Sequence, residues 1–257
     1  MIHWQRVGFV HGVMNTDNLS ILGQTIDYGP YGWLENYDRN WTPNTTDLLH
    51  KRYRFGKQPN IALWNLTQLA NALYPLIEEV EPLQEILQEY KRDYTLGFHK
   101  MMCKKLGLFV QEEVVVEFID QLEDNLEHSQ IDMTIFFREL SSDATLDFKL
   151  FWNILKRSSY LSVDELKKQQ AHWKMWFENY SSLIEKENVE KAARSSKMKA
   201  INPKYVLRNY MAQLAIDAAE QEDNSPVEEL YTLLLQPYAE QPAMEKWYAK
   251  RPDWAMN

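Results

Sequence analysis

Cysteine is nearly absent from this chain of 257 residues, and Cys103 is its only copy. An intrachain disulfide is therefore impossible, and the composition fits a reducing compartment, so we expect a cytoplasmic protein. For the thiol in its sequence KMMCKKLGL, a buried or chemically idle cysteine is expected rather than a reactive one.

Long apolar runs and an excess of positive charge are missing as well. No segment approaches the length of a membrane span, and the first residues, MIHWQRVGFVHG, lack the pattern of a signal peptide. We therefore expect no membrane association. The formal net charge is −9, and a surface of that sign repels phosphate backbones, so nucleic-acid binding is not expected. A nucleotide held through a divalent cation is still allowed, because the metal reverses the local sign.

Glycine is scarce beyond the first quarter of the chain: six of the eight glycines lie at or before residue 56. Glycine concentrates where the backbone turns sharply or approaches a ligand closely. The pattern predicts two short strands, 18–22 and 24–27, around Gly23, followed by a long ordered loop over 28–57. We assign residues 1–58 to the loops that carry the chemistry.

From residue 59 onward, apolar residues recur every three or four positions, which is typical of helices. Asn202 and Pro203 match the cap and the first position of a helix. The sequence therefore predicts a mainly α fold with a small β ribbon, in which residues 59–257 form a helical lobe. The expected helices cover 60–77, 81–107, 111–128, 132–141, 145–157, 162–185, 186–199, a segment from 202, 225–236 and 242–249.

The stretch FVHGVMNTDNLSILGQTIDYGP, residues 9–30, places two loops with carboxylates about ten residues apart. Mg²⁺ prefers oxygen ligands and is held by one or two carboxylates, with phosphate and water completing its shell. Asn18 and Asp27 could supply such oxygens, and Asp17 directly precedes the amide. Ordinary turns are the alternative, because Asp and Asn side chains also bond their own backbone.

The spacing in this stretch has a parallel in kinase-like folds. There a His-Gly-Asp or His-Arg-Asp loop is followed, five residues after its Asp, by a metal-binding Asn, and a metal-binding Asp comes on the next strand. Here Asn18 is in register, but Val13 stands at the position of the usual base and cannot accept a proton. Together with QPNIALWNLTQLANAL, KLGL and NPKYVLRNYMAQLAI, the stretch resembles selenoprotein O-like proteins, the kinase-fold pseudokinases that act as protein adenylyltransferases.

This resemblance implies transfer of AMP from ATP to a Ser, Thr or Tyr hydroxyl of a protein substrate. By the same resemblance, Asp17 accepts the proton of the hydroxyl. Asn18 and Asp27 hold Mg²⁺ or Mn²⁺, and Asp27 also lies against the nucleotide phosphates. The implied fold is a kinase-like C-lobe with a family-specific helical extension. We expect His11 to fix the loop through hydrogen bonds rather than to act as an acid or base.

Several parts of a complete kinase-like enzyme are not found in this sequence. Only ten residues precede His11, and they contain neither a glycine-rich phosphate loop nor a lysine. The chain therefore looks like the C-terminal half of such a protein, and we expect weak or no activity without the missing N-terminal lobe. Pro43 stands where the family often has a loop cysteine, and the final residues RPDWAMN contain no cysteine, so a redox-gated loop is not expected.

Two other functions are open at this point. A non-catalytic helical module that has lost ATP and only docks partners is favoured by the absence of a nucleotide lobe. A phosphotransferase of the aminoglycoside-kinase type is suggested by the His-Gly, Asn and Ile-Asp pattern. Val13 argues against the latter, because that class needs an Asp at this position.

Overall fold

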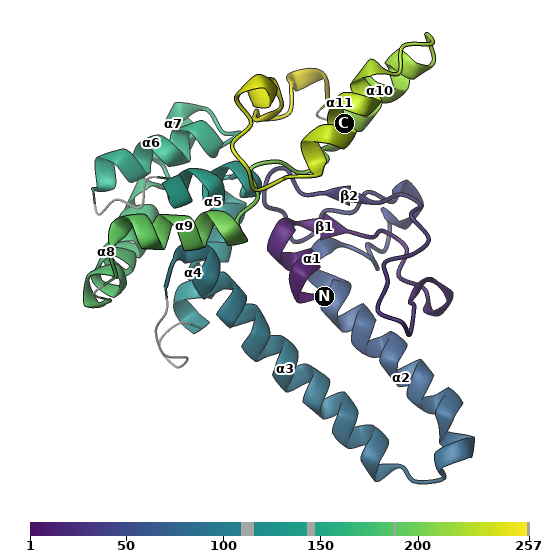
Figure 1. Ribbon diagram of the computed structural model, residues 1–257. Helices are drawn as coiled ribbons and strands as arrows, with labels where there is room; N and C mark the ends of the chain where they lie inside the picture. Colours follow the sequence, from purple (N-terminus) through teal and green to yellow (C-terminus); the bar gives the residue numbers. More distant parts are fainter. Residues whose placement is uncertain (109–115, 143–146, 188, 256–257) are drawn as a thin grey trace. The chain divides into compact units, whose positions relative to one another are not determined.

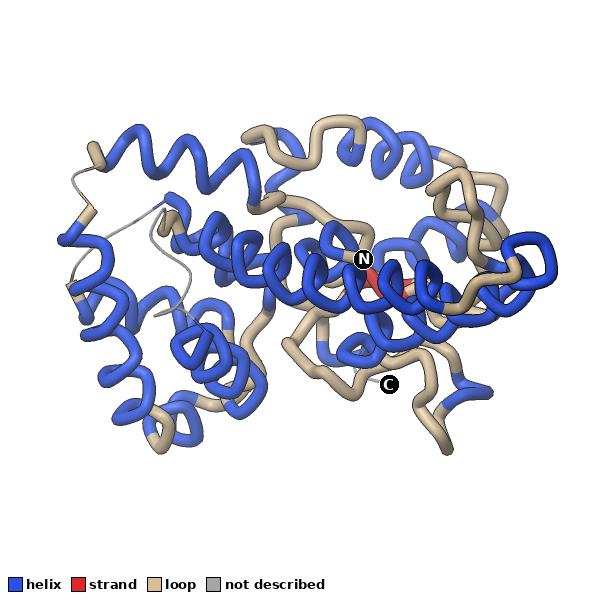
Figure 2. The backbone as a smooth tube through the Cα atoms, turned by 90° about the horizontal axis from the view of Figure 1, so that it is seen from below, coloured by secondary structure: helices blue, strands red, loops and turns tan. Residues whose placement is uncertain are grey.

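The computed structural model describes residues 1–108, 116–142, 147–187 and 189–255, and most of them are helical (Figures 1 and 2). Within these ranges the only sheet is two-stranded and pairs β1 (Phe9–Val10) with β2 (Gly32–Trp33). The expected mainly α fold with a small β ribbon is confirmed. Its likeness to a kinase C-lobe stays a prediction. None of the described helices is long and apolar enough to cross a membrane.

Backbone contacts divide the chain into two compact units. Unit 1 comprises Met1–Gly32 and Asp38–Lys100, and unit 2 comprises Trp33–Tyr37 and Met101–Asn257. The division by role at residue 58 stays a prediction. The helices are α1 (Ile2–Val7), α2 (Gln58–Ile77), α3 (Glu81–Leu106), α4 (Val116–His128), α5 (Met133–Ser142), α6 (Phe148–Ser158), α7 (Val163–Lys167), α8 (Gln170–Lys186), α9 (Lys191–Ile201), α10 (Asn209–Ala219) and α11 (Ser225–Leu234).

Most of the predicted helices are present, but several begin or end at residues other than those predicted. The predicted helix 162–185 is two helices, because Ser162 forms a capping box with Glu165 and α7 ends at Lys167 before α8 begins. The predicted helix 242–249 is a 3₁₀ helix over Pro242–Trp247. Parts of the predictions over 111–128 and 145–157, namely 111–115 and 145–146, lie outside the described residues.

The predicted helix start at Asn202 is wrong. Asn202 ends α9, and its buried Nδ2 donates to the Lys105 carbonyl at 2.8 Å and to Ser141 Oγ at 2.9 Å. The following segment is extended, with the amides of Lys204 and Tyr205 bonded to the Pro237 carbonyl. The side chain of Asn202 thus satisfies the end of α3 instead of starting a helix, and α10 begins only at Asn209.

The two strands predicted around Gly23 are also wrong. The structure has one isolated bridge there, between Leu19 and Thr25, and Gly23 turns the chain in the left-handed region with φ 75°. The amide of Leu22 bonds Ser20 Oγ at 3.1 Å, so the turn closes locally before a ladder can form. The segment 28–57 is a long loop as expected, apart from β2 and short 3₁₀ turns.

Unit 1 is built around the buried N-terminal half of α2. The helix begins at Gln58 with Pro59 in its first turn, where a missing amide costs nothing. Ile61 and Ala62 pack with Met14 in a small buried cluster, and Tyr90 of α3 donates to the Pro59 carbonyl at 3.0 Å. Burial raises the pKa of Tyr90 to about 12. This packing places α2 directly beneath the loop that follows β1.

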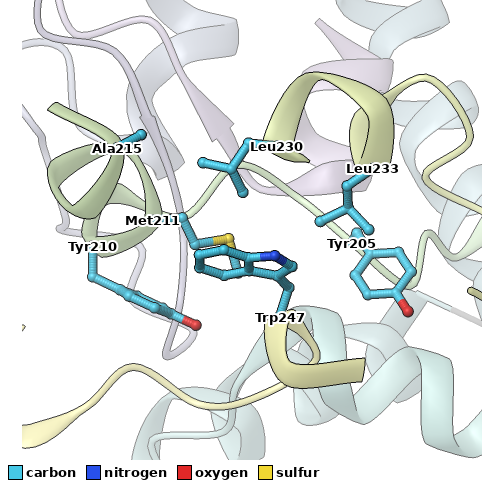
Figure 3. Close-up of a cluster of buried hydrophobic side chains, with 7 residues drawn as sticks. All are labelled: Tyr205, Tyr210, Met211, Ala215, Leu230, Leu233 and Trp247. Atoms are coloured by element: carbon cyan, nitrogen blue, oxygen red, sulfur yellow. The ribbon is translucent and has the colours of Figure 1, made fainter. Parts of the chain in front are cut away.

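Unit 2 has an aromatic core contributed by α4, α5, α6 and α8. Trp173 and Trp176 are fully buried, and the Trp176 ring stacks on Phe118 with 4.8 Å between centroids. Cys103 lies in this unit, and burial raises the pKa of its thiol to about 11, as expected for an idle cysteine. A second apolar cluster of this unit, shown in Figure 3, packs α10 and α11 around Trp247.

A buried ion pair in unit 2 joins the residue before α10 to the residue before α5. Arg208 donates both terminal nitrogens to Asp132, at 2.7 and 3.0 Å, and both side chains are essentially inaccessible. Asp132 also accepts the Ile135 amide at the start of α5 and the Tyr160 hydroxyl. Bidentate geometry and these extra bonds compensate the desolvation of both charges.

Candidate functional site

The loop after β1, residues 11–18, carries the predicted site and is wrapped around a buried histidine. His11 is buried, its ring Nε2 lies 2.8 Å from the Ile26 carbonyl, and its backbone amide donates to Gln58 Oε1 at 3.0 Å. Its ring also stacks on Trp4, with 5.7 Å between centroids. These contacts confirm that His11 holds the loop through hydrogen bonds.

Amide side chains from outside the loop bind its backbone. Gln58 bridges both sides of one turn, donating from Nε2 to the Phe9 carbonyl at 2.9 Å while accepting from His11. Asn44 Nδ2 donates to the Gly12 carbonyl, and Asn65 Nδ2 donates to the Met14 carbonyl, both at 3.0 Å. All three side chains are buried, so each bond replaces a contact with water and leaving it unmade would be costly.

Gly12 brings the loop against the segment that follows Asp27. Its φ is 82°, and a Cβ at this position would lie 2.5 Å from the Pro30 carbonyl oxygen and 3.2 Å from Pro43. Only glycine combines this backbone conformation with so close an approach. The bond from His11 to Ile26 and the approach of Gly12 to Pro30 thus hold residues 26–30 against residues 11–12 from both sides of Asp27.

The three predicted site residues lie on these two adjoining segments. Asp17 is exposed on a single 3₁₀ turn, Thr16–Asn18, whose start is held by a hydrogen bond from the Tyr53 hydroxyl to Asn15. Asn18 is half-buried, and its Nδ2 donates to the Val13 carbonyl at 2.9 Å. Asp27 is exposed and adopts a left-handed conformation with φ 56°. The roles of these residues stay predictions.

The side-chain oxygens of Asn18 and Asp27 are of the kind that magnesium and manganese ions bind. Because the amide nitrogen of Asn18 is bonded to Val13, its amide oxygen is the atom left to bind a cation, and Asp27 offers a carboxylate. Over the ranges the structure describes, no group of three or more His, Cys, Asp or Glu side chains could hold a metal by itself. A cation held by Asn18 and Asp27 would therefore take its remaining ligands from phosphate and water.

The sequence did not indicate the residues that support the loop. Gln58, Asn44 and Asn65 reach it from 32 to 51 positions away along the chain, and no spacing rule connects such positions. The one available signal is that two of these amides, Gln58 and Asn65, interrupt the apolar pattern on the inner face of α2. A buried amide on an otherwise apolar helix face needs a polar partner.

Comparison with known proteins gives matches along the whole chain. The family described as "Protein adenylyltransferase SelO" matches residues 1–235. A protein of Flavobacterium johnsoniae named "Protein nucleotidyltransferase YdiU" is 57% identical over 260 residues, which cover 100% of this chain and 49% of the relative. Proteins of the same name from Rhodopirellula baltica and Aromatoleum aromaticum are 47% and 48% identical, covering 100% and 99% of this chain and 50% and 48% of the relatives.

The chain thus spans about half the length of the curated relatives that it matches. Identity at this level over the complete chain, together with the family match over most of it, leaves no ambiguity about descent. The hydrogen-bonded loop 11–18 and its partner segment 26–30 both lie within the matched region. The chain belongs to the SelO family, whose matching relatives carry the name protein nucleotidyltransferase YdiU.

Proposed function

We propose that this chain is the catalytic-loop half of a protein adenylyltransferase, which moves AMP from ATP to a Ser, Thr or Tyr hydroxyl of a protein substrate. The observation that carries the proposal is the pair of bonds from His11 to Ile26 and from Asn18 to Val13. These hydrogen bonds connect the segments that carry Asn18 and Asp27 to residues 11–13. The chain that contains them belongs to the SelO family.

In the proposed reaction, the substrate hydroxyl oxygen attacks the α-phosphorus of ATP. The bond between the α-phosphorus and the bridging oxygen breaks, and pyrophosphate leaves with the electron pair. Asp17, exposed on its turn, accepts the hydroxyl proton. Asn18 and Asp27 hold Mg²⁺ or Mn²⁺, which supplies positive charge against the phosphates. The supporting amides keep the loop preformed, so that little reorganisation is needed when the substrates bind.

The isolated chain is proposed to be weakly active or inactive. It offers an acid–base residue and two metal ligands, whereas a triphosphate also needs cationic groups and backbone amides along its length. We expect these groups in the part of the family sequence that this chain does not span. Among the described residues, no observation favours the non-catalytic module or the aminoglycoside-kinase type.

A chimera provides a direct test. This chain replaces the matching half of the Flavobacterium johnsoniae relative, to which it is 57% identical, and transfer of label from α-³²P-ATP to protein is measured with Mn²⁺ or Mg²⁺. The expected result is labelled protein from the chimera and little or none from the chain alone. Label from γ-³²P-ATP instead would indicate phosphoryl transfer and contradict the proposal.

Variants of the chimera separate the residue roles. Asp27→Ala is expected to abolish both Mn²⁺ binding and transfer, whereas Asp17→Asn is expected to abolish transfer and leave Mn²⁺ binding intact. Asp38→Asn serves as a matched control, because Asp38 lies in the same loop region and its Oδ1 accepts the Asn40 amide at 2.7 Å. Transfer that survives Asp27→Ala would refute the metal assignment.

A further inference from the structure

An apolar groove borders the site and is lined in part by Asn65, one of the supporting amides. It has a volume of about 290 Å³ and lies within unit 1, between the turn that carries Asp17 and the middle of α2. Its walls are mainly apolar, yet Ile21 on one side is 84% exposed and Leu69 on the other is 39% exposed. Asn65 reaches the groove from the buried half of α2.

Helix α2 has a large exposed surface but no charged residue, which is unusual. Its 20 residues include no charged side chain, although charged residues make up 25% of the chain. Only the first half of the helix is buried; from Asn71 to Ile77 every residue is exposed, including Leu73 and Leu76. Depletion of charge on an exposed apolar face is typical of the core of an interface rather than of a solvated surface.

A buried polar atom of Asn65, a residue that lines this groove, is a second observation that points to an occupant. Asn65 is buried and donates from Nδ2 to the Met14 carbonyl, which leaves Oδ1 as its acceptor. In the part of the chain that the structure describes, this Oδ1 is buried without a hydrogen-bond partner. Buried acceptors are almost always satisfied in native proteins, so the occupant is expected to bring a donor to this position.

We propose that this groove and the exposed half of α2 form the docking surface for the rest of the family polypeptide. The chain spans about half of its relatives, so about as much sequence again exists in them to cover this surface. The occupant is an amphipathic segment, with an apolar face against Leu69 and Ile21 and one donor that reaches Asn65 Oδ1. This docking brings the part of the family polypeptide that this chain does not span beside Asp17.

The test is a co-expression experiment that requires no catalytic activity. The affinity-tagged chain is produced together with the untagged part of the Flavobacterium johnsoniae relative that this chain does not match, and the purified material is analysed by sedimentation velocity. Leu69→Glu and Ile21→Asp place a charge in the groove. Leu150→Glu is the matched control, because Leu150 is 41% exposed on α6 of unit 2.

The wild-type chain and Leu150→Glu are expected to retain the untagged part in equal amounts, and both groove variants at least tenfold less. Circular dichroism checks that Leu69→Glu folds, and Ile21→Asp decides the question if it does not, because that side chain is almost fully exposed. No retention by the wild-type chain, or equal retention by all variants, overturns the proposal. Self-association of the chain that both groove variants abolish would assign the groove to a second copy and also overturn it.

Discussion

Replacing Gly12 by alanine probes the contact that holds the two halves of the candidate site together. The left-handed conformation of residue 12 costs a residue with a Cβ about 1–2 kcal/mol. A methyl group only 2.5 Å from the Pro30 carbonyl oxygen must also displace backbone, which costs about 1–3 kcal/mol in a packed region. The sum predicts that Gly12→Ala destabilises the closed loop by about 2–5 kcal/mol.

Gly23 supplies a matched control for this substitution. Its φ is 75°, close to that of Gly12, but a Cβ there would meet nothing within 4 Å. Gly23→Ala therefore incurs only the conformational cost of about 1–2 kcal/mol. The difference between the two variants isolates the contact with Pro30 from the backbone strain that they share.

Hydrogen exchange of the loop amides is the suitable assay, because the chain has two compact units and global unfolding need not be two-state. The Val13 and Asn18 amides are followed in wild type and in both variants. Gly12→Ala is expected to lower their opening free energy by about 2–5 kcal/mol, a loss of protection of about tenfold for every 1.4 kcal/mol. Equal effects of Gly12→Ala and Gly23→Ala would refute the tight approach of the two segments.

Three further outcomes follow from the same structure. Asn18→Leu removes the hydrogen bond to Val13 and one candidate oxygen ligand. Mn²⁺ titrations of the chimera are therefore expected to show at least about tenfold weaker binding, and Asn40→Ala at an exposed position is the control. Unchanged binding would remove Asn18 from the metal site. Arg208→Met leaves Asp132 buried without its ion partner, so hydrogen exchange of the most protected amides of unit 2 is expected to show a loss of about 3–5 kcal/mol, partly recovered by adding Asp132→Asn. A loss that Asp132→Asn does not recover would contradict this origin. The hydrogen bond from Lys204, with a further one from Arg138, lowers the pKa of Glu240 from its ordinary value of 4.5 to about 2. A carboxyl whose pKa is lower in the folded state stabilises above its unfolded pKa and loses that effect as the pH falls. The stability difference between wild type and Glu240→Gln should therefore be constant above about pH 5 and shrink between about pH 4.5 and 2; a difference that grows on acidification would contradict the ion pairs.

Local sequence was sufficient for features whose partners lie nearby in the chain. The alternation of apolar residues every three or four positions predicted most helices, because a helix buries one face whatever it packs against. The Asn18 side chain donates to the Val13 carbonyl, and these two residues are the ones whose five-residue spacing has a parallel in kinase-like folds. His11 was expected to fix the loop through hydrogen bonds, and its ring contacts the Ile26 carbonyl.

Predictions failed where a distant partner decided the local structure. Asn202 has the sequence of a helix cap, but the Lys105 carbonyl at the end of α3 and Ser141 Oγ bind its side chain. The strands expected around Gly23 need a ladder, and the Ser20 side chain closes the turn first. Helix α1 was not predicted; it is only six residues long and ends at Gly8, where φ is 73°.

The sequence by itself determined that oxygen-bearing side chains stand at 17, 18 and 27, that the net charge is −9, and that the fold is mainly helical. Spacing along the chain conveys these properties because neighbours in sequence share one loop or one helix face. Only the tertiary structure decided how the loop is held, since Gln58, Asn44 and Asn65 approach it from remote positions. The tertiary structure also showed that part of the uncharged helix α2 is exposed to solvent and that, among the described residues, Asn65 Oδ1 is buried without a hydrogen-bond partner. Neither fact can be known before the burial of each atom is known.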